Sequence, residues 1–570
     1  MIWRFRDIDA HRAERLAREL GQPLKVGEFL AARGFREAPE VRSFIRAELK
    51  NLPAPLSLTD MDKAVDRLMT ARRRDELVAV CGDYDADGLT AAALLTLGLR
   101  ELGHRTLTRI PNRLTDGYGL KPGPVLELAE SGAKIIITVD NGISDREAVE
   151  AAVKAGVDVI ITDHHHLPPE MPPAVAIINP HRDAVWRDSP PAGVGVAFLL
   201  LAALKKSYSQ AGLLGEGEGP ALMDYLPLVA IGTIADMVPL LGPNRILVRH
   251  GLSFLGNSKQ PGLTALKKIA RVGGDKINPR DIGFRLAPRL NAAGRLGSAD
   301  PALELLLAEE DNQANRLAAK LEELNRERHQ GQSRLCAEAL ERLEAEISPD
   351  SRTVVLSGEN WPRGLLGLAA SRVAEATSKP TVLFSLENGL AVGSGRSAGN
   401  FNLYGALNEM RHLFISFGGH AQAVGLTLES RYLDEFRLGL EDGAQGEPDF
   451  QSEAELMIDL KVELGDLDPL ARSLSVLEPF GQAHPAPVLV VRSARVADAR
   501  PTDSGGELHM KMTLGEGLNR RQVMGFNLAS RLCEVRRELD VVLGLEISEY
   551  RGQMNPTWRL LDFRPPEQEG

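Results

Sequence analysis

Three carboxylates stand within five residues of one another in the first fifth of the chain. Asp83, Asp85 and Asp87 follow an apolar run that begins at residue 78, and an alanine-rich apolar pattern over 89–102 comes directly after them. Acids this close raise one another's pKa and destabilise a fold unless a cation lies between them, so a divalent metal is the simplest reason to keep them together. The alternative is a polar turn whose acids cap the N-terminus of the following helix.

Two further strand ends carry side chains of the same kind. Asp140 follows one apolar run, and Asp163, His164 and His165 follow the next. Apolar, β-branched runs that alternate with amphipathic helical segments predict an α/β fold with a doubly wound parallel sheet, whose strand ends meet at one edge. The expected strands are 77–81, 106–110, 134–139, 157–161 and 175–178. A single histidine is more often a core residue than a ligand and a single aspartate often caps a helix, but this convergence favours a metal site.

The composition is that of an ordinary soluble globular protein. Of the 570 residues, 25% are charged and 43% are hydrophobic, and the length suits roughly four domain-sized units. No apolar run is long enough to cross a membrane and the first residues lack the apolar region of a signal peptide, so we expect a cytoplasmic protein without membrane contact. The net charge of −11 argues against a uniformly basic coat for nucleic acid, but it is compatible with a basic groove.

Changes of pattern divide the chain into five segments. An arginine-rich helical lead over 1–60 precedes the α/β segment with the acidic motifs, 61–298. Residues 299–347 predict one long helix that connects two domains, with a coiled-coil dimer as the competing interpretation. A second, smaller α/β unit is expected at 348–445, and short β-rich runs over 450–570 predict a small β-barrel.

Seven short motifs follow one another in a specific order. They lie at residues 82–88, 111–119, 139–143, 162–165, 193–197, 232–240 and 288–296. In this order the chain resembles the DHH phosphoesterase family, named for the Asp-His-His triplet that is found here at 163–165, over most of its length. The resemblance is closest to the bacterial single-strand-specific exonucleases of that family. It implies a DHH domain, a DHHA1 domain at 348–445 and an OB-fold as the C-terminal barrel.

The resemblance implies a site for two divalent ions. The family pattern makes the ligands Asp85, Asp87, Asp140, His164 and Asp236, and Asp83 belongs to the same motif. The mixture of carboxylates and imidazole favours Mn²⁺, while Mg²⁺ remains an option. Two ions about 3.5–4 Å apart can activate water and stabilise charge on phosphate oxygens. His165 resembles the histidine that faces the substrate phosphate, and with Asp85, Asp87 and Asp140 it forms the expected catalytic set.

The family also implies two groups of residues that hold substrate phosphates. In the first α/β segment the candidates are Arg113, Arg289, Asn291 and Arg295. In the second unit the candidates are Ser394 and Arg396, which would hold a terminal phosphate, and the nearby His420. Guanidinium groups suit this task because they can bind a phosphate through two parallel hydrogen bonds. Pro362 stands where many relatives have histidine, which puts a substrate role for that position in doubt.

The expected function is that of a metal-dependent exonuclease that releases mononucleotides from the 5′ end of single-stranded DNA, in recombination and repair. The polarity and the preference for DNA rest on the resemblance. The alternatives are a phosphodiesterase of short oligonucleotides or cyclic dinucleotides and a catalytically silent DNA-binding scaffold. The resemblance also implies single-stranded-DNA-binding protein and a RecQ-type helicase as partners. Because one chain carries every part of the expected site, we expect a monomer.

Overall fold

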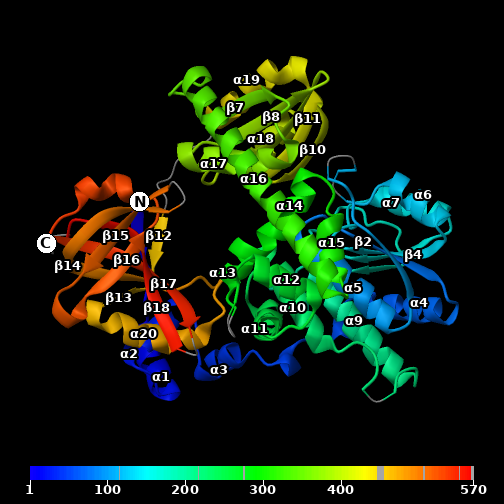
Figure 1. Ribbon diagram of the computed structural model, residues 1–570, viewed down its shortest axis with the longest axis horizontal. Helices are drawn as coiled ribbons and strands as arrows, with labels where there is room; N and C mark the ends of the chain where they lie inside the picture. Colours follow the sequence, from blue (N-terminus) through cyan, green and yellow to red (C-terminus); the bar gives the residue numbers. More distant parts are fainter. Residues whose placement is uncertain are drawn as a thin grey trace.

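Three bodies make up the molecule, and one long helix joins two of them. The computed structural model describes residues 1–113, 116–117, 119–215, 217–273, 277–445, 455–504, 507–550 and 553–566. Figure 1 shows an α/β body on the right, a smaller α/β body above it and a β-barrel on the left, with the N-terminus beside the barrel. None of the helices in these described ranges has the length and apolar character that crossing a membrane requires.

The first body contains the predicted parallel sheet. Its strands are β2 (Leu77–Gly82), β3 (Arg105–Arg109), β4 (Ala133–Val139), β5 (Asp158–Thr162) and β6 (Ala176–Ile178). They lie in the order β3-β2-β4-β5-β6, and every neighbouring pair is parallel. One face is covered by α4 (Met61–Arg73), α5 (Ala86–Glu101) and α9 (Gly193–Gln210), and α10 (Leu222–Ala235) packs on α5 and α9. The other face is covered by α6 (Pro122–Glu130) and α7 (Arg146–Lys154). Because both faces are buried, the strands are continuous apolar runs, and the predicted fold class is confirmed.

The strand order brings the acidic motifs together. The connection that leaves β2 runs over one face of the sheet through α5, whereas α6 and α7 lie on the other face. The winding therefore reverses between β2 and β4, and ligands bind beyond the carboxyl ends of the strands at such a switch point. The three acids after β2 and the aspartate after β4 flank this point.

The segment expected as a single long helix is two helices. α15 (Asp300–Leu307) ends at Ala308, and α16 (Asp311–Glu346) begins after Glu310; both of these residues have extended backbone. The break allows Leu305 and Leu306 of α15 to pack in the core of the first body, while α16 continues to the second. The expected continuous helix over 299–347 is therefore corrected to a 36-residue α16 preceded by a short separate helix.

The second body is a five-stranded mixed sheet. Its strands are β7 (Val354–Glu359), β8 (Thr381–Glu387), β9 (Leu390–Arg396), β10 (Phe414–His420) and β11 (Ala423–Glu429), in the order β10-β11-β9-β8-β7. Only the β7–β8 pair is parallel. Three helices accompany the sheet, α17 (Arg363–Thr377), α18 (Leu403–Glu409) and α19 (Leu433–Gln445). Helix α17 contacts both this sheet and α14 (Ala287–Leu296) of the first body, so it lies where the two α/β bodies meet.

The C-terminal strands close into a five-stranded barrel. The strands are β14 (Val488–Ser504), β15 (Glu507–Leu514), β16 (Arg521–Gly525), β17 (Glu538–Tyr550) and β18 (Gln553–Arg564). The order β14-β15-β16-β18-β17 is closed by pairing of β17 with β14, which is consistent with the predicted OB-fold.

The N-terminal lead packs on this barrel. A strand that the sequence did not predict, β1 (Ile2–Phe5), pairs in parallel with β12 (Glu455–Ile458). The helices α1 (Ala10–Leu20), α2 (Leu24–Ala32) and α3 (Ala38–Arg46) share an apolar core with the barrel strands and α20 (Leu467–Leu474). Arg33 donates to both oxygens of the buried Asp459 at 2.6 Å, across a separation of 426 residues in the sequence. Most of the lead's apolar face is therefore structural.

Candidate metal centre and phosphate site

Seven of the predicted side chains meet beyond the ends of β2, β4 and β5. Nε2 of His164 lies 3.1 Å from an oxygen of Asp140, 3.5 Å from one of Asp236 and 4.0 Å from one of Asp87. Atoms that can bind a metal fall into three groups, and within each group they lie no more than 4.8 Å apart. The groups are Asp140 with His164 and His165, Asp87 with His164 and Asp236, and Asp83 with Asp85 and Asp140. Asp140 and His164 belong to two groups each, so the three groups form one cluster.

Asp85 serves the helix cap and the cluster at the same time. One of its oxygens accepts hydrogen bonds from the backbone N–H groups of Asp87 (3.0 Å) and Gly88 (3.2 Å) at the start of α5. The capping alternative is thus correct for this residue. A carboxylate has two oxygens, and the second remains available to a cation.

The start of α9 holds Asp87 and leaves no space beside Asp140. The backbone N–H groups of Gly193 (2.7 Å) and Val194 (3.0 Å) donate to the two oxygens of Asp87. A Cβ atom at Gly193 would lie 2.5 Å from Cβ of Asp140. Asp140 has φ of 62°, in the left-handed region that aspartate tolerates better than most residues and that is often found at functional sites.

Replacing Gly193 by alanine should therefore displace Asp140. No rotamer relieves a contact between two Cβ atoms, so either α9 or the Asp140 backbone must move. We expect a loss of activity of about 100-fold, typical of misplacement by about 1 Å, and a lower melting temperature. Steady-state rates and thermal unfolding test this, with Gly123→Ala as control because its Cβ would meet nothing within 4 Å. Full activity of the Gly193 variant would contradict the close packing.

The electrostatics of the cluster favour a bound cation. Burial and the neighbouring carboxylates raise the pKa of Asp83 and Asp140 far above the usual value. The same causes raise the pKa of Asp87 to about 7 and that of Asp236 to about 9. Burial lowers the pKa of His164 to about 4, so its imidazole is neutral and able to act as a ligand.

Several of these atoms also lack a hydrogen-bond partner. Among the residues that the structure describes, the buried atoms Oδ1 of Asp83, Oδ1 of Asp140, Nε2 of His164 and Oδ2 of Asp236 make no hydrogen bond. Buried polar atoms are nearly always paired, and each unpaired one costs about 1–3 kcal/mol. Carboxylate oxygens are ligands for both Mn²⁺ and Mg²⁺, and a neutral imidazole nitrogen suits Mn²⁺ better, so these residues fit divalent cations.

Asp163 has a role that the sequence did not reveal. Its Oδ1 accepts hydrogen bonds from the backbone N–H groups of His164 (2.7 Å) and His165 (3.0 Å) and lies 2.7 Å from Nδ1 of His165, while Oδ2 accepts from the N–H of Ile143. Burial alone would lower the pKa of His165, but the hydrogen bond and charge of Asp163 raise it to about 9. Asp163 therefore positions both histidines and keeps His165 protonated. The sequence signals for this residue were its place at the end of β5 and its membership of the Asp-His-His triplet, and neither showed what its side chain binds.

Replacing Asp163 by asparagine should weaken activity and move its pH dependence. The variant loses the charge that raises the pKa of His165, so the imidazolium should lose its proton at a lower pH. We expect a fall of about 10- to 100-fold in kcat/KM, as for other residues that orient metal ligands, and an alkaline limb of the pH–rate profile at lower pH. Asp158→Asn, at the start of the same strand, is the control. An unchanged profile would show that Asp163 does not control His165.

Guanidinium groups gather beside the cluster. Burial lowers the pKa of Arg295 to about 10, and the nearby charges of Arg113, Arg328 and Arg396 act in the same direction. Arg113 lies over the ring of Tyr84, 4.9 Å from its centre. Guanidinium groups that share one region can bind an anion together, and here the first and second bodies both contribute.

The second body supplies Ser394 and Arg396 to this region, and His420 lies in the same row of its sheet. Arg396 donates to Oγ of Ser394 at 3.2 Å, and both side chains lie over Gly367 of α17, where a Cβ atom would come within 3.0 Å of each. The strand register pairs Arg396 with Ala423 and Ala423 with His420, which places His420 two strands away in the same row.

The remaining two predicted residues differ in their surroundings. Oδ1 of Asn291 accepts from the backbone N–H of Ala86 at 2.7 Å, so α14 is fixed against the acidic motif. Arg289 points instead to α16, where it forms an ion pair with Glu322 at 2.6 Å and donates to the carbonyl of Arg285. Its geometry here is that of a contact between helices.

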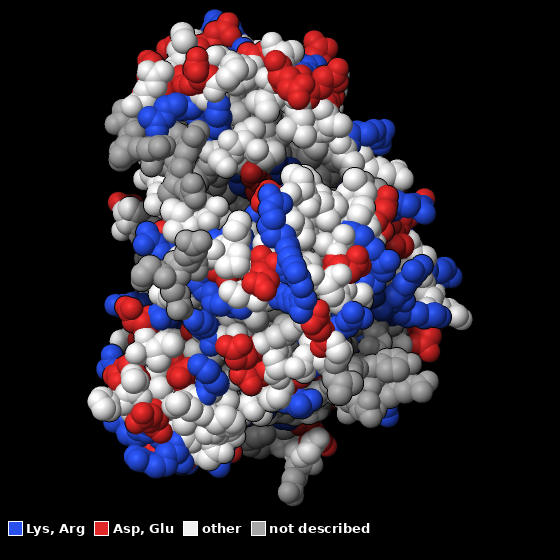
Figure 2. Space-filling view, turned by 90° about the vertical axis from the view of Figure 1, so that its left-hand side faces the viewer, with Lys and Arg blue, Asp and Glu red and all other residues white. Residues whose placement is uncertain are grey.

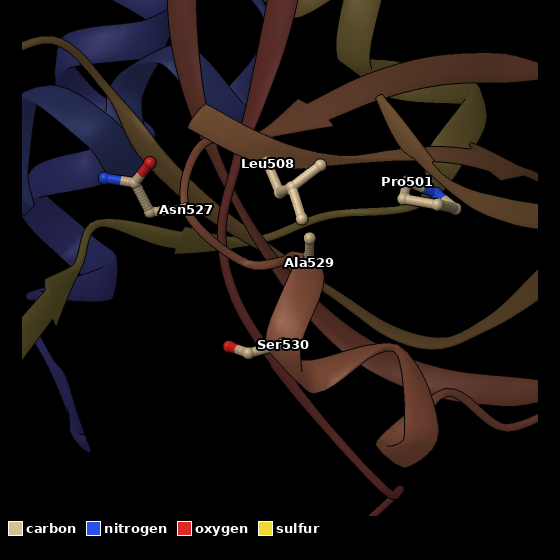
Figure 3. Close-up of a pocket in the computed structure, with 5 residues that line it drawn as sticks. All are labelled: Pro501, Leu508, Asn527, Ala529 and Ser530. Carbon is tan, nitrogen blue, oxygen red and sulfur yellow. The ribbon is translucent and has the colours of Figure 1, made fainter. Parts of the chain in front are cut away.

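The barrel has a pocket of another character. It has a volume of about 530 Å³ and is lined by Pro501, Leu508, Asn527, Ala529 and Ser530, with Leu508 directed toward Ala529 (Figure 3). None of these side chains is ionisable, so the pocket cannot supply acid–base or metal chemistry. On the barrel side of the molecule, basic and acidic side chains alternate in small groups, with no uniform basic coat (Figure 2).

Family comparisons match all three bodies. The N-terminal domain of the DHH family matches residues 77–233, the DHHA1 domain matches 350–442 and the RecJ OB domain matches 458–562. The matched ranges contain every member of the metal cluster except Asp236, which lies three residues beyond the first range.

Proteins similar over nearly the whole chain bear one name. The single-stranded-DNA-specific exonuclease RecJ of Bacillus subtilis is 34% identical, with 99% of this chain and 72% of the relative aligned. The protein of the same name from Escherichia coli is 36% identical, with 93% of this chain and 94% of the relative aligned. The crystal structure of RecJ from Thermus thermophilus in complex with Mn²⁺ superposes with a TM-score of 0.84 at 30% identity, covering 100% of this chain and 80% of that one. A Mg²⁺ complex of the Thermus protein superposes with a TM-score of 0.78.

Proposed function

Because this chain belongs to the RecJ family of single-stranded-DNA-specific exonucleases, we propose that it hydrolyses single-stranded DNA from the 5′ end and releases mononucleotides, in recombination and repair. The observation that carries the proposal is the buried cluster of carboxylates around neutral His164, whose unpaired atoms fit divalent cations. In this proposal residues 61–298 carry out the chemistry, 348–445 hold the end of the strand and 450–570 guide its remainder.

The proposed ligands of two cations are Asp83, Asp85, Asp87, Asp140, His164 and Asp236, of which Asp140 belongs to two of the three ligand groups. Mn²⁺ is favoured because imidazole takes part. Divalent cations bound there would activate water and neutralise charge that develops on the phosphate. The protein's own contribution is to hold the ligands rigidly through the α5 cap, the start of α9 and Asp163.

His165 is proposed to face the phosphate. Its side chain is 46% exposed, unlike the buried His164, and Asp163 keeps it protonated. An imidazolium in this position can donate a hydrogen bond through Nε2 to a phosphate oxygen, because Nδ1 is occupied by Asp163. It can therefore stabilise the negative charge that grows during in-line attack.

Arg113, Arg295 and Arg396, together with the neighbouring Ser394, form an arginine group that is proposed to select the 5′ end. Arg113, Arg295, Arg396 and Ser394 line one region, and a terminal phosphate carries more charge than an internal diester. Binding it there would place the first phosphodiester bond over the metal cluster. Arg289, Asn291 and His420 complete the proposed substrate set; the first two act through the position of α14.

A monomer is proposed because each proposed group belongs to one chain. The family resemblance extends the proposal to single-stranded-DNA-binding protein and a RecQ-type helicase as partners. Size-exclusion chromatography with light scattering, and pull-down with each purified partner, test these points separately.

Digestion of a long single strand labelled at either end tests the function. With Mn²⁺ or Mg²⁺, we expect early release of mononucleotide from the 5′ label, late release from the 3′ label and no release with chelator. Survival of the long strand together with hydrolysis of di- to pentanucleotides would replace the proposal by a small-substrate phosphodiesterase. Binding of the strand without cleavage under all metal conditions would leave only a scaffold.

A further inference from the structure

Phe284 is the most exposed large apolar side chain in the described part of the protein. It is 76% exposed, whereas Ile282 and Leu286 on the same short segment are completely buried. The segment is a π-helical turn, η4 (Ile282–Leu286), and such turns are uncommon and often occur at functional sites. The local backbone therefore directs one aromatic ring into solvent while its apolar neighbours form the core.

The segment lies between the metal cluster and the barrel. On its C-terminal side η4 continues into α14, where Asn291 binds the backbone of the acidic motif. Asn291 follows Phe284 by seven residues, a distance of about 10 Å along a helix at 1.5 Å per residue. On its N-terminal side α13 (Pro279–Asp281) carries Arg280, which forms an ion pair with Glu546 of β17. Figure 1 shows α13 on the side of the first body that faces the barrel.

Basic groups accompany the exposed ring. The guanidinium carbon of Arg280 lies 5.8 Å from the centre of the Phe284 ring. Arg285 follows Phe284 directly, pairs with Asp281 at 3.1 Å and donates to the carbonyl of the exposed Arg271. An aromatic face beside cations is the arrangement that binds single-stranded nucleic acid, because the base stacks on the ring and the cations attract the phosphates.

We propose that Phe284 is a base-stacking contact for the DNA strand on its way between the barrel and the metal cluster. This inference rests on the proposed function, and it adds a nucleotide-binding position outside both the metal cluster and the arginine group. Stacking is insensitive to base identity, so it suits an enzyme that moves along any sequence.

A scan of abasic sites tests the contact. The substrates are 5′-phosphorylated 40-nucleotide oligothymidylates, each with a single abasic residue at a different position from the 5′ end, with Mn²⁺. For the unmodified protein we expect one internal position where the missing base raises KM by about 5- to 100-fold, the loss of one stack, with little change in kcat. The Phe284→Ala variant should have this raised KM already on the intact strand. An abasic residue at the sensitive position should not raise the KM of this variant further. Phe284→Trp should behave as the parent, and oligothymidylate should quench its new tryptophan fluorescence in the presence of chelator.

The controls separate this inference from general damage and from failure of the proposed function. Phe254→Ala, on α11 (Gly242–Gly256) and 38% exposed, should leave KM unchanged. An abasic profile of Phe284→Ala identical to that of the unmodified protein, or a KM within twofold of it, would overturn the stacking contact. A parent protein that does not cleave the intact 40-nucleotide strand would instead refute the proposed function.

Discussion

Replacing Asp140 by asparagine should abolish strand cleavage and at the same time stabilise the metal-free protein. Asp140 belongs to two of the three ligand groups, and asparagine keeps its shape and tolerates the same left-handed backbone. We expect a loss of about a thousandfold or more, equivalent to about 4 kcal/mol of transition-state stabilisation. Binding of single-stranded DNA should remain, because the arginine group and the barrel are unaffected.

The gain in stability follows from the direction of the pKa shift. Burial and the neighbouring carboxylates raise the pKa of Asp140 above its value in the unfolded chain. At a pH above the pKa of Asp140 in the unfolded chain, this carboxyl group is ionised in the unfolded state. In the folded state it must either stay charged among the neighbouring carboxylates or take up a proton, so the cost to folding grows as the pH rises. Without metal, the Asp140→Asn variant should therefore be more stable than the parent protein at pH 8, and this gain in stability should be smaller at pH 5.

Addition of Mn²⁺ should reverse the order of stability. A ligand that binds only the folded state adds about 2.7 kcal/mol at 100 times its dissociation constant, and the variant should lose most of this gain. Thermal unfolding at both pH values, with chelator and with Mn²⁺, measures all four cases; Asp66→Asn on the exposed face of α4 is the control. If Mn²⁺ stabilised the variant as much as the parent, Asp140 would not be a ligand.

The strand ends could be predicted from the sequence because their positions depend on local pattern. Each parallel strand is an apolar β-branched run, and the carboxyl ends of such strands lie at one edge, so residues 83–87, 140 and 164 had to be close. Periodicity also indicated the second sheet and the barrel. The break between α15 and α16 was missed because nothing in residues 308–310 stops a helix; packing of Leu305 and Leu306 decides it.

The parts that could not be predicted depend on contacts between distant segments. Asp236 follows an apolar helix, and only the family resemblance distinguished it from an ordinary helix end. Gly193 and Asp163 act on the cluster through backbone groups, which side-chain patterns do not show. The pairing of β1 with β12 joins residues 2–5 to 455–458, and no local signal specifies such a partner.

Arg245→Met should loosen the barrel from the first body. Arg245 lies on α11, is only 1% exposed and stacks on Phe44 of α3 with its guanidinium carbon 3.6 Å from the ring centre. It donates to the carbonyl of Phe44 and to those of Leu477, Glu478 and Pro479, at 2.7–3.0 Å. One side chain thus ties the first body to the lead and to the segment that enters the barrel.

The expected cost is large because methionine keeps the stem and removes every donor. Hydrogen bonds to charged groups contribute about 1.5–3 kcal/mol each, and the variant loses them. Part of this loss is offset, because the variant no longer buries a cation, whose pKa burial lowers to about 9. We expect a net loss of about 3 kcal/mol in the free energy of unfolding, measured by urea denaturation followed by circular dichroism and by tryptophan fluorescence. Arg249→Met, which removes one hydrogen bond to Glu478, should cost about 1 kcal/mol.

Activity measurements on Arg245→Met distinguish a loss of contact between the first body and the barrel from a disturbance of the first body itself. The metal cluster is built from the first body alone, so Arg245→Met should keep kcat on short oligonucleotides while KM for long strands rises as the barrel loses its fixed position. Equal losses on short and long strands would mean that the substitution disturbs the first body itself. An unchanged free energy of unfolding would mean that other contacts, such as the hydrogen bond from Leu240 to the carbonyl of Gln482, already hold the two parts together.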